Sequence, residues 1–335
     1  MKTPLLLLFA LSLSTCSRGA AQGVPAAGGS SGDRAEASRF PAFPARARSG
    51  PSEAFGRQWF SGDAEVNGYR ATVPRYGEAR NAELVLIYVT EPMSRRTWIK
   101  DDDARGDDRV GVLKLNMSLK FTTGIYPYSV LTSVFSPYGD WGRERLSPVK
   151  LTLSAQEWCG HVFHGVWPGE DRAVSQLFSY FAQEGESRTE LATPPGALYE
   201  DALLIQLREL DGPFAGGHDW RGPILPSLWR TRRRHRPLAP EDATITRAEA
   251  TVDGVPAHRF TLRYGDFERV IDVERGGAHR MLGWRTNDGE DVRLTRSARL
   301  PYWQLNHNAD LPRREEIGVE VPAHAAGEAS GTVGF

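Results

Sequence analysis

Cysteine is scarce in this sequence, because 335 residues contain only Cys16 and Cys159. Two cysteines cannot supply the multiple disulfides that hold small secreted domains together, and a chain of this length can bury a sizeable core without them. A structural zinc ion needs four ligands, and the surroundings of Cys159 offer three candidates, with no second cysteine pair elsewhere. We therefore expect no metal site and no cofactor.

An excess of charge of one sign is also lacking. The chain has 41 Lys and Arg against 42 Asp and Glu, a net charge of −1, so composition gives no reason to expect nucleic acid as a partner. No second apolar run of 18 residues follows the N-terminal one, which argues against a membrane-spanning helix. Gly-rich phosphate loops, Gly-x-Ser-x-Gly elbows and His-Glu-x-x-His helices are absent.

The N-terminus carries the clearest signal in the chain. Lys2 precedes the apolar run Leu5–Leu13, which is too short to cross a bilayer that needs about 20 residues. Leu13-Ser-Thr-Cys16 then has the layout of a bacterial lipoprotein signal, so we expect Cys16 to be lipidated and to anchor the chain to a membrane. The alternative is an ordinary secretory signal cut near Gly19–Ala21, which would release the protein to the periplasm.

The residue after the anchor bears on which membrane holds it. Ser17, rather than Asp, resembles the pattern of outer-membrane sorting. We therefore expect a protein of the cell envelope, lipid-anchored to the outer membrane and facing the periplasm.

Composition divides the chain into five parts. Segments rich in Ala, Gly, Ser, Pro and Arg, with few large aliphatic side chains, are typical of tethers and tails. The parts are a signal at 1–16, a disordered linker at 17–52, an N-terminal β half at 53–195, a helix with a C-terminal β-meander half at 196–311, and a disordered tail at 312–335.

Hydrophobic side chains recur with a period of two, which indicates half-buried strands. This alternation runs through Leu113–Phe121 and Val149–Ala155, while Glu83–Thr90 is apolar enough to be covered on both faces. Turn residues separate runs of about eight residues in the C-terminal half, at Asp253-Gly254, Gly265-Asp266, Gly276-Gly277 and Asn287-Asp288-Gly289. The predicted fold is mainly β, with one or more antiparallel meander sheets that could curve into a barrel-like form, and one or two short helices.

One helix is predicted at Tyr199–Leu210. Leu203, Leu207 and Leu210 would form its buried face, with Glu200, Gln206 and Glu209 pointing away. The following segment, Gly212–Pro240, is rich in Pro, Gly and Arg and is predicted to be a long loop.

Three motifs resemble a known group of proteins. They are Gly124-Ile-Tyr-Pro-Tyr-Ser129, Gln156-Glu-Trp-Cys-Gly-His161 and Arg299-Leu-Pro-Tyr-Trp303. Together they resemble bacterial envelope lipoproteins of unknown function, over about Phe60 to Trp303. Members often carry the label "septum formation inhibitor Maf", which would imply a nucleotide pyrophosphatase. This sequence lacks the Ser-x-x-Arg-Arg-type start and the α/β alternation of true Maf proteins, so the resemblance implies the name without the activity.

The C-terminal half is similar to a second group, a family of periplasmic β-proteins of unknown function. In that family a helix bearing a Leu-Arg pair precedes an antiparallel meander. Leu207-Arg208 and the strands from Thr244 to Arg296 would correspond. Neither resemblance implies catalytic residues.

Cys159 belongs to the one local cluster that suggests chemistry, since His161 and His164 follow closely. The functional hypothesis makes Cys159 a nucleophile and His161 its base, which would require an exposed thiol ionised by a nearby cation. The structural hypothesis, which we favour, makes Cys159 a small buried residue in a strand, with Trp158 and Phe163 as core or cross-strand aromatics. In an unbroken strand Cys159 and His161 share a face, and His164 lies on the other.

A basic run at Arg230–Arg236 stands beside two tryptophans. It could meet anionic lipid head groups at a membrane surface, for which the candidate residues are Trp220, Trp229, Arg232, Arg233 and Arg234, or it could be a solvated loop. The sequence therefore favours a non-enzymatic, membrane-anchored envelope protein that binds a lipid, a glycan or another envelope component on a β-sheet. The alternative is a hydrolase or transferase that uses Cys159 and His161.

Overall fold

The computed structural model describes residues 40–44, 46–208, 210 and 212–321. These residues lie within one compact unit, Ser38–Phe335. The predicted signal and lipidation site, Cys16 included, lie outside the described residues, as does most of the predicted linker. In the part that the structure describes, no helix has the length and apolar character needed to span a membrane.

The strands form a single 15-stranded sheet, which confirms the mainly β prediction. Its first half is an antiparallel meander in which each strand pairs with the next along the chain. We call this the N-terminal meander; it consists of β1 (Ala64–Arg75), β2 (Glu78–Ser94), β3 (Arg109–Thr123), β4 (Tyr126–Pro137), β5 (Lys150–Glu157), β6 (Gly160–Pro168), β7 (Arg172–Ser179) and β8 (Glu186–Ala192).

The second half is the C-terminal meander. It starts after residue 196, so the predicted division between the two halves falls in the β8–β9 connection. Its strands are β9 (Leu198–Tyr199), β10 (Trp220–Leu225), β11 (Glu241–Val252), β12 (Val255–Tyr264), β13 (Phe267–Glu274), β14 (Met281–Thr286) and β15 (Asp291–Leu300). The four predicted turns join β11 to β15, and Asp253, Gly254 and Gly289 take the positive φ that such turns need.

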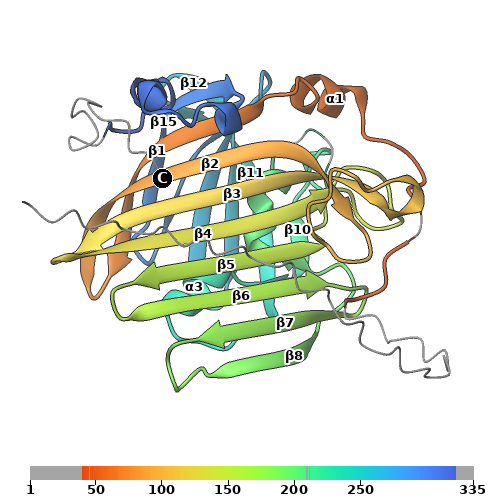
Figure 1. Cartoon of the computed structure of the whole chain (residues 1–335), viewed down its shortest axis with the longest axis horizontal. Coiled ribbons are helices and arrows are strands. Elements are labelled where there is room, and N and C mark those ends of the chain that lie inside the picture. Colours follow the sequence, from red (N-terminus) through yellow and green to blue (C-terminus); the bar gives the residue numbers. More distant parts are fainter. Residues whose placement is uncertain (1–39, 45, 209, 211, 322–335) are drawn as a thin grey trace, which may run out of the picture. The chain divides into compact units, whose positions relative to one another are not determined.

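The first and last strands join the two meanders, because β1 pairs antiparallel with β15. The sheet order runs from β8 through β1 and β15 to β9, and only the short β9 pairs in parallel with its neighbour, β10. Figure 1 shows the strands of the C-terminal meander crossing behind those of the N-terminal meander. Buried side chains from both layers form one hydrophobic core. The sheet is not closed, since β8 and β9 remain at its edges.

Alternation predicts the strand faces correctly. In β3, Leu113, Leu115, Met117, Leu119 and Phe121 are buried in the shared core. In β2 both faces are covered, as expected: Leu84, Leu86 and Tyr88 enter the shared core, while Val85 lies in a separate cluster with Val319.

The segment between the meanders differs from its prediction. Instead of one helix at Tyr199–Leu210, the chain forms the short η2 (Glu200–Ala202) and α2 (Leu203–Gln206). Glu200 and Gln206 were expected to point away from the core, but both are buried. The physical reason is that the segment belongs to the core between the two layers of sheet, so it has no solvent-facing side.

The predicted loop at Gly212–Pro240 is also wrong. It contains β10, which pairs with the edge strand β9, and the helix α3 (Leu228–Arg233), whose N-cap Ser227 accepts a hydrogen bond from the Arg230 amide at 3.4 Å. Figure 1 shows α3 behind β5 and β6. Pro and Gly content misled the prediction because β10 and α3 are short and gain their stability from burial rather than from local propensity.

The ends of the folded unit are more ordered than predicted. α1 (Glu53–Trp59) starts at its N-cap Ser52, and before it Phe43 packs on Trp98 and Trp141, within the predicted linker. At the other end, 3₁₀ helix η4 (Asn308–Ile317) extends into the predicted tail, which starts at residue 312. Short 3₁₀ turns also occur at η1 (Gly106–Asp108) and η3 (Tyr302–Gln304).

Candidate functional site

A cavity of about 400 Å³ lies between the outer strands of the N-terminal meander and α3. Its volume falls in the range of ligand pockets, roughly 300–1,000 Å³. We call it the β6–β8 cavity, because those strands supply one wall, while α3 and the residues after it supply the other. The apolar lining comes from Leu177, Leu191, Pro237 and Leu238.

The rest of the β6–β8 cavity lining is polar or charged, and a histidine and a serine are among its buried members. His164 Nε2 and Ser175 Oγ lie 2.8 Å apart, and both residues are buried. Burial, reinforced by the positive charge of Arg232, lowers the pKa of His164 to about 4. At neutral pH this imidazole is therefore uncharged, which suits a wall that contacts an apolar ligand.

An ion-pair cluster borders the same cavity. Glu184, in the β7–β8 turn, pairs with Arg232 of α3 and contacts His235 Nδ1 at 2.7 Å. The Phe181 ring lies under the Arg232 guanidinium, at 4.8 Å, and against the His235 ring. These contacts tie the β7–β8 turn to the end of α3.

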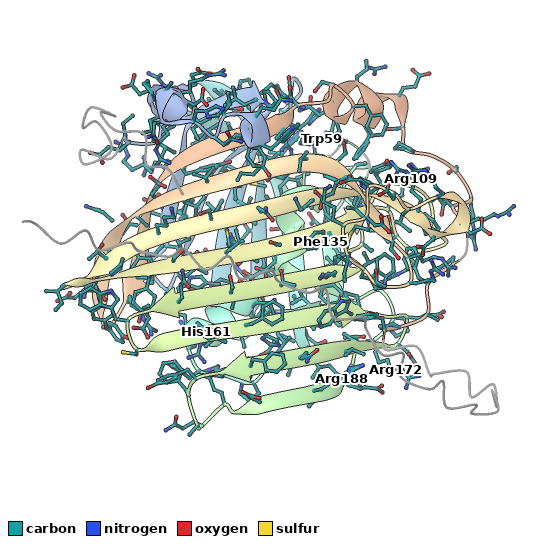
Figure 2. All side chains as sticks on the ribbon, viewed as in Figure 1. Trp59, Arg109, Phe135, His161, Arg172 and Arg188 are labelled. Atoms are coloured by element: carbon teal, nitrogen blue, oxygen red, sulfur yellow. The ribbon has the colours of Figure 1, made fainter. Side chains whose placement is uncertain are left out.

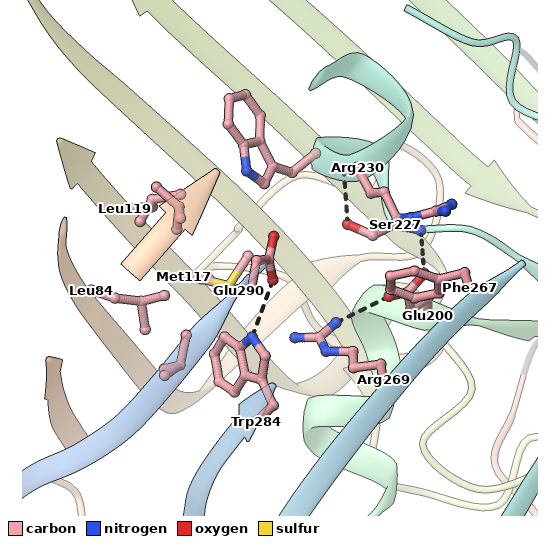
Figure 3. A pocket seen from close by; sticks show the side chains of 13 residues that line it. Leu84, Met117, Leu119, Glu200, Ser227, Arg230, Phe267, Arg269, Trp284 and Glu290 are labelled. Atoms are coloured by element: carbon pink, nitrogen blue, oxygen red, sulfur yellow. Dashed lines mark hydrogen bonds and ion pairs between the residues drawn. The ribbon is translucent and has the colours of Figure 1, made fainter. Parts of the chain in front are cut away.

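A second charged cluster fills the interior between the layers (Figure 3). Glu200 accepts hydrogen bonds from the Ser227 amide at 2.9 Å, the Tyr264 hydroxyl at 2.6 Å and Arg269 at 3.1 Å. The neighbouring Asp201 accepts the Leu228 amide, and burial raises the pKa of its carboxyl to about 6. The cavity beside Glu200 measures about 20 Å³, room for about one water molecule, so this cluster is structural.

The Leu207-Arg208 pair also has a structural role. Arg208 is fully buried and forms a bidentate pair with Glu65 of β1, at 2.7 and 3.0 Å. Its guanidinium lies 4.7 Å from the Trp59 ring centroid and 4.6 Å from that of Tyr88. Burial by itself would raise the pKa of Glu65, but Arg208 lowers it below its ordinary value. We call the stretch that contains η2, α2 and Arg208 the inter-meander segment. The ion pair fixes the end of this segment to β1.

The structure places Cys159 in the turn between β5 and β6, where it is an exposed free thiol. This corrects the favoured prediction of a buried residue in a strand. The turn forms because the Glu157 carboxylate accepts the Cys159 amide at 2.7 Å, closing the hairpin before a strand can continue. Trp158 is likewise exposed rather than part of the core, while Phe163 is half-buried.

The surroundings of Cys159 do not activate it as a nucleophile. Its hydrogen bond to Glu157 raises the pKa of the thiol, whereas a nucleophilic cysteine needs a nearby cation. His161 is exposed near the same end of β6, as Figure 2 shows, but no hydrogen bond joins it to Cys159 among the described residues. His164 lies on the opposite face, as alternation predicts, and the residues described include no group of three ligands arranged for a metal ion.

The basic run turns largely inward. Trp229 is buried in the core and Trp220 is half-buried against it. Arg233 pairs with Asp288 at 2.8 Å, Arg234 pairs with the same carboxylate at 3.0 Å, and Arg232 pairs with Glu184. Of the five residues predicted to bind lipid, Arg232 lines the β6–β8 cavity.

Sequence reasoning missed the pairing of His164 with Ser175. The available signal was alternation, because His164 falls between Val162 and Val166 on one face of its strand and all three are buried. Register supplied the rest: β6 and β7 pair so that Val166 lies opposite Ser175, which puts the serine on the same face.

Comparison with known proteins adds little to this geometry. No family model matches the chain, and no curated protein matches it. Among solved structures it is similar to the crystal structure of a β-barrel-like protein of the domain of unknown function DUF1849 from Brucella abortus, with TM-score 0.43 and 9% identity, over 71% of this chain and 98% of that one. The resemblance to the lipoprotein and Maf-labelled group therefore rests on the quoted motifs alone.

Proposed function

We propose that this protein is a non-enzymatic envelope lipoprotein, anchored through Cys16 to the outer membrane and facing the periplasm, that binds a lipid acyl chain in the β6–β8 cavity. The observation that carries the proposal is the cavity itself: about 400 Å³, between strands and helix, with Leu177, Leu191, Pro237 and Leu238 in its lining. Burying apolar chain against such a lining releases about 25 cal/mol per Å². An acyl chain is the envelope component whose shape and chemistry fit it best.

The polar groups of the β6–β8 cavity support the same ligand class. His164 is neutral and already paired with Ser175, so an apolar chain passing it leaves no charge unpaired. Arg232 and Arg236 both line the cavity and could meet a ligand head group, and Glu184 holds Arg232 in place.

The hydrolase alternative has less support. Cys159 and His161 stand at or beside an exposed turn outside the β6–β8 cavity, and Glu157 raises the pKa of the thiol. The His164–Ser175 pair lies in the cavity, but a histidine with a pKa of about 4 is a poor general base at neutral pH.

A fluorescent fatty acid tests the proposal directly. The full chain, stripped of bound lipid, is titrated with cis-parinaric acid, and Thr189→Trp fills the β6–β8 cavity from β8. We expect saturable binding that the variant weakens by about tenfold or more. Ser154→Trp, on the exposed face of β5, is the matched control and should bind as the parent does. Absence of binding, or equal binding by the parent and Thr189→Trp, contradicts the proposal.

Native mass spectrometry of the protein taken from its own membrane tests the anchor. It should show a mature chain that begins at an acylated Cys16, together with a co-purifying lipid. An unmodified start at Ala21 or Gln22 would remove the anchor from the proposal.

A further inference from the structure

One end of the N-terminal meander exposes a row of large hydrophobic side chains. In an antiparallel meander alternate turns lie at the same end, so the β1–β2, β3–β4, β5–β6 and β7–β8 turns stand together. Each carries one such side chain, with these exposed fractions: Tyr76 60%, Ile125 82%, Trp158 69% and Tyr180 65%. We call these four residues the tip surface.

Ring contacts make the tip surface continuous. The hydroxyls of Tyr76 and Tyr128 lie 2.7 Å apart, and the ring of Tyr126 bridges from Tyr128, at 5.9 Å, to Trp158, at 6.2 Å. Tyr180 packs so closely on Gly160, in the next hairpin, that a Cβ there would meet its ring at 2.5 Å. Neighbouring turns are therefore linked through side chains, with the buried Tyr128 between Tyr76 and Tyr126, and Ile125 stands next to Tyr126 in the chain.

The turns themselves do not need these side chains. Gly77 and Gly124 take the positive φ in two of them, and the Glu157 carboxylate closes a third. Scattered exposed hydrophobics need no explanation, but a contiguous row of them marks a contact with a partner.

The chemistry of the tip surface fits a lipid bilayer. Trp and Tyr have an apolar body and a polar tip, and they concentrate where membrane meets water. Separate projecting tips can each enter the soft head-group region of a bilayer. Some of the charges nearby are paired within the protein, as Glu184 is with Arg232 and Glu78 with Arg80, and the others have both signs, Arg75 and Lys120 against Glu157 and Glu186. Burial of apolar surface, rather than attraction to anionic lipid, would therefore drive the contact.

We propose that the tip surface docks on a phospholipid bilayer, with Ile125 and Trp158 in the boundary between head groups and acyl chains and Tyr76 and Tyr180 at head-group level. The docking does not require the β6–β8 cavity to bind lipid. It would, however, place the β7–β8 turn, which borders that cavity, against the membrane. A lipid anchor on the same chain would raise the effective concentration of the tips, so a weak contact would suffice.

A fluorophore at Cys159 reads out docking at the tip surface itself. Full chain carrying Cys16→Ser has Cys159 as its only thiol, and an environment-sensitive dye there reports water loss. We expect blue-shifted, brighter emission with phosphatidylcholine vesicles, about the same with added phosphatidylglycerol and at high salt, and quenching by lipids spin-labelled near the head group. Unchanged emission with vesicles overturns the proposal.

Two controls separate docking from dye-driven insertion. Ile125→Ser should weaken vesicle partitioning by about tenfold. Ile99→Ser, in the connection at the opposite end of the meander and 60% exposed, should not change it. In a further variant the dye is attached to the cysteine of Ile99→Cys, in a chain that also carries Cys159→Ser. Vesicles should leave the emission of this dye unchanged. Equal responses at the two ends, or no effect of Ile125→Ser, contradict the proposal. Thr189→Trp should leave vesicle docking intact. The docking proposal and the proposal of fatty-acid binding in the β6–β8 cavity can therefore fail separately.

Discussion

The two meanders use the same backbone arrangement but differ at their turns. In the C-terminal meander the turns are made of small polar residues, such as Asp253-Gly254 and Asn287-Asp288-Gly289. In the N-terminal meander four turns at one end carry Tyr76, Ile125, Trp158 or Tyr180. Since polar turns suffice to build a meander, the hydrophobic ones indicate a function outside the fold.

The two meanders also differ in how their inner faces contact the segment that lies between them. The C-terminal meander holds the inter-meander segment through buried charge, with Arg269 and Tyr264 on Glu200. The N-terminal meander contacts the same segment through apolar side chains, through a neutral hydrogen bond from the Tyr88 hydroxyl to the Leu204 carbonyl at 2.9 Å and, at the segment's end, through the buried Glu65–Arg208 ion pair. At its start the segment is therefore held by buried charge from the C-terminal meander, and in its middle by packing and a neutral hydrogen bond from the N-terminal meander; the ion pair with Glu65 holds its end.

Removing the buried charge should have the largest effect on stability. Glu200→Gln keeps the side-chain size but leaves Arg269 buried without its carboxylate, so we expect the free energy of unfolding to fall by about 3–5 kcal/mol. Urea unfolding followed by circular dichroism measures it.

Two matched variants sharpen this result. Tyr88→Phe removes the neutral contact on the N-terminal side and should cost about 1 kcal/mol. Glu268→Gln breaks the exposed pair with Arg263 on β13 and should cost less than about 1 kcal/mol. If Glu200→Gln costs no more than Tyr88→Phe, the two sides hold the segment in the same way and the contrast fails.

The next effect concerns protons in the β6–β8 cavity. The pKa of His164 is lowered to about 4 in the folded state, so unfolded chains bind a proton near their ordinary pKa of about 6.5 while folded chains do not. His164 therefore contributes stability above pH 6.5 that is lost as pH falls toward 4, about 3 kcal/mol in all. His164→Gln should remove that part of the acid destabilisation, measured by urea unfolding between pH 7 and pH 4.

His161→Gln is the control on the same strand. His161 is exposed, so its replacement should leave the pH dependence of unfolding unchanged. The same change of slope in both variants would mean that burial of His164 is not the cause.

The smallest effect is expected at the tip surface end. Cys159→Ser should change the free energy of unfolding by less than about 0.5 kcal/mol, because the side chain is exposed and packs nothing. The thiol should react with maleimide in the folded protein. Because the thiolate is the reactive form and the pKa of the thiol is raised, the reaction should become faster as the pH rises. Val162→Ala, in the same hairpin but buried, should cost about 1 kcal/mol or more. A thiol that reacts only after denaturation would contradict the exposed turn.

Prediction from sequence succeeded where a pattern is local. The strands around Leu113–Phe121 and the turn at Asp253-Gly254 follow from side-chain alternation and from residues able to take positive φ. It failed where neighbours distant in sequence decide. Glu200 was expected on a solvent-facing side, yet Arg269, 69 residues away, makes its burial favourable. Cys159 was expected in a strand, because Gln156–His161 shows no strong turn residue before Gly160.

The sequence by itself determined the fold class and the strand faces, because each depends on neighbouring residues along one strand or turn. Only the tertiary structure decided that one sheet joins the halves through β1 and β15, that a cavity lies between β6–β8 and α3, and that four hydrophobic tips share one end. Strand register and layer packing bring these residues together, and neither is encoded in any single segment.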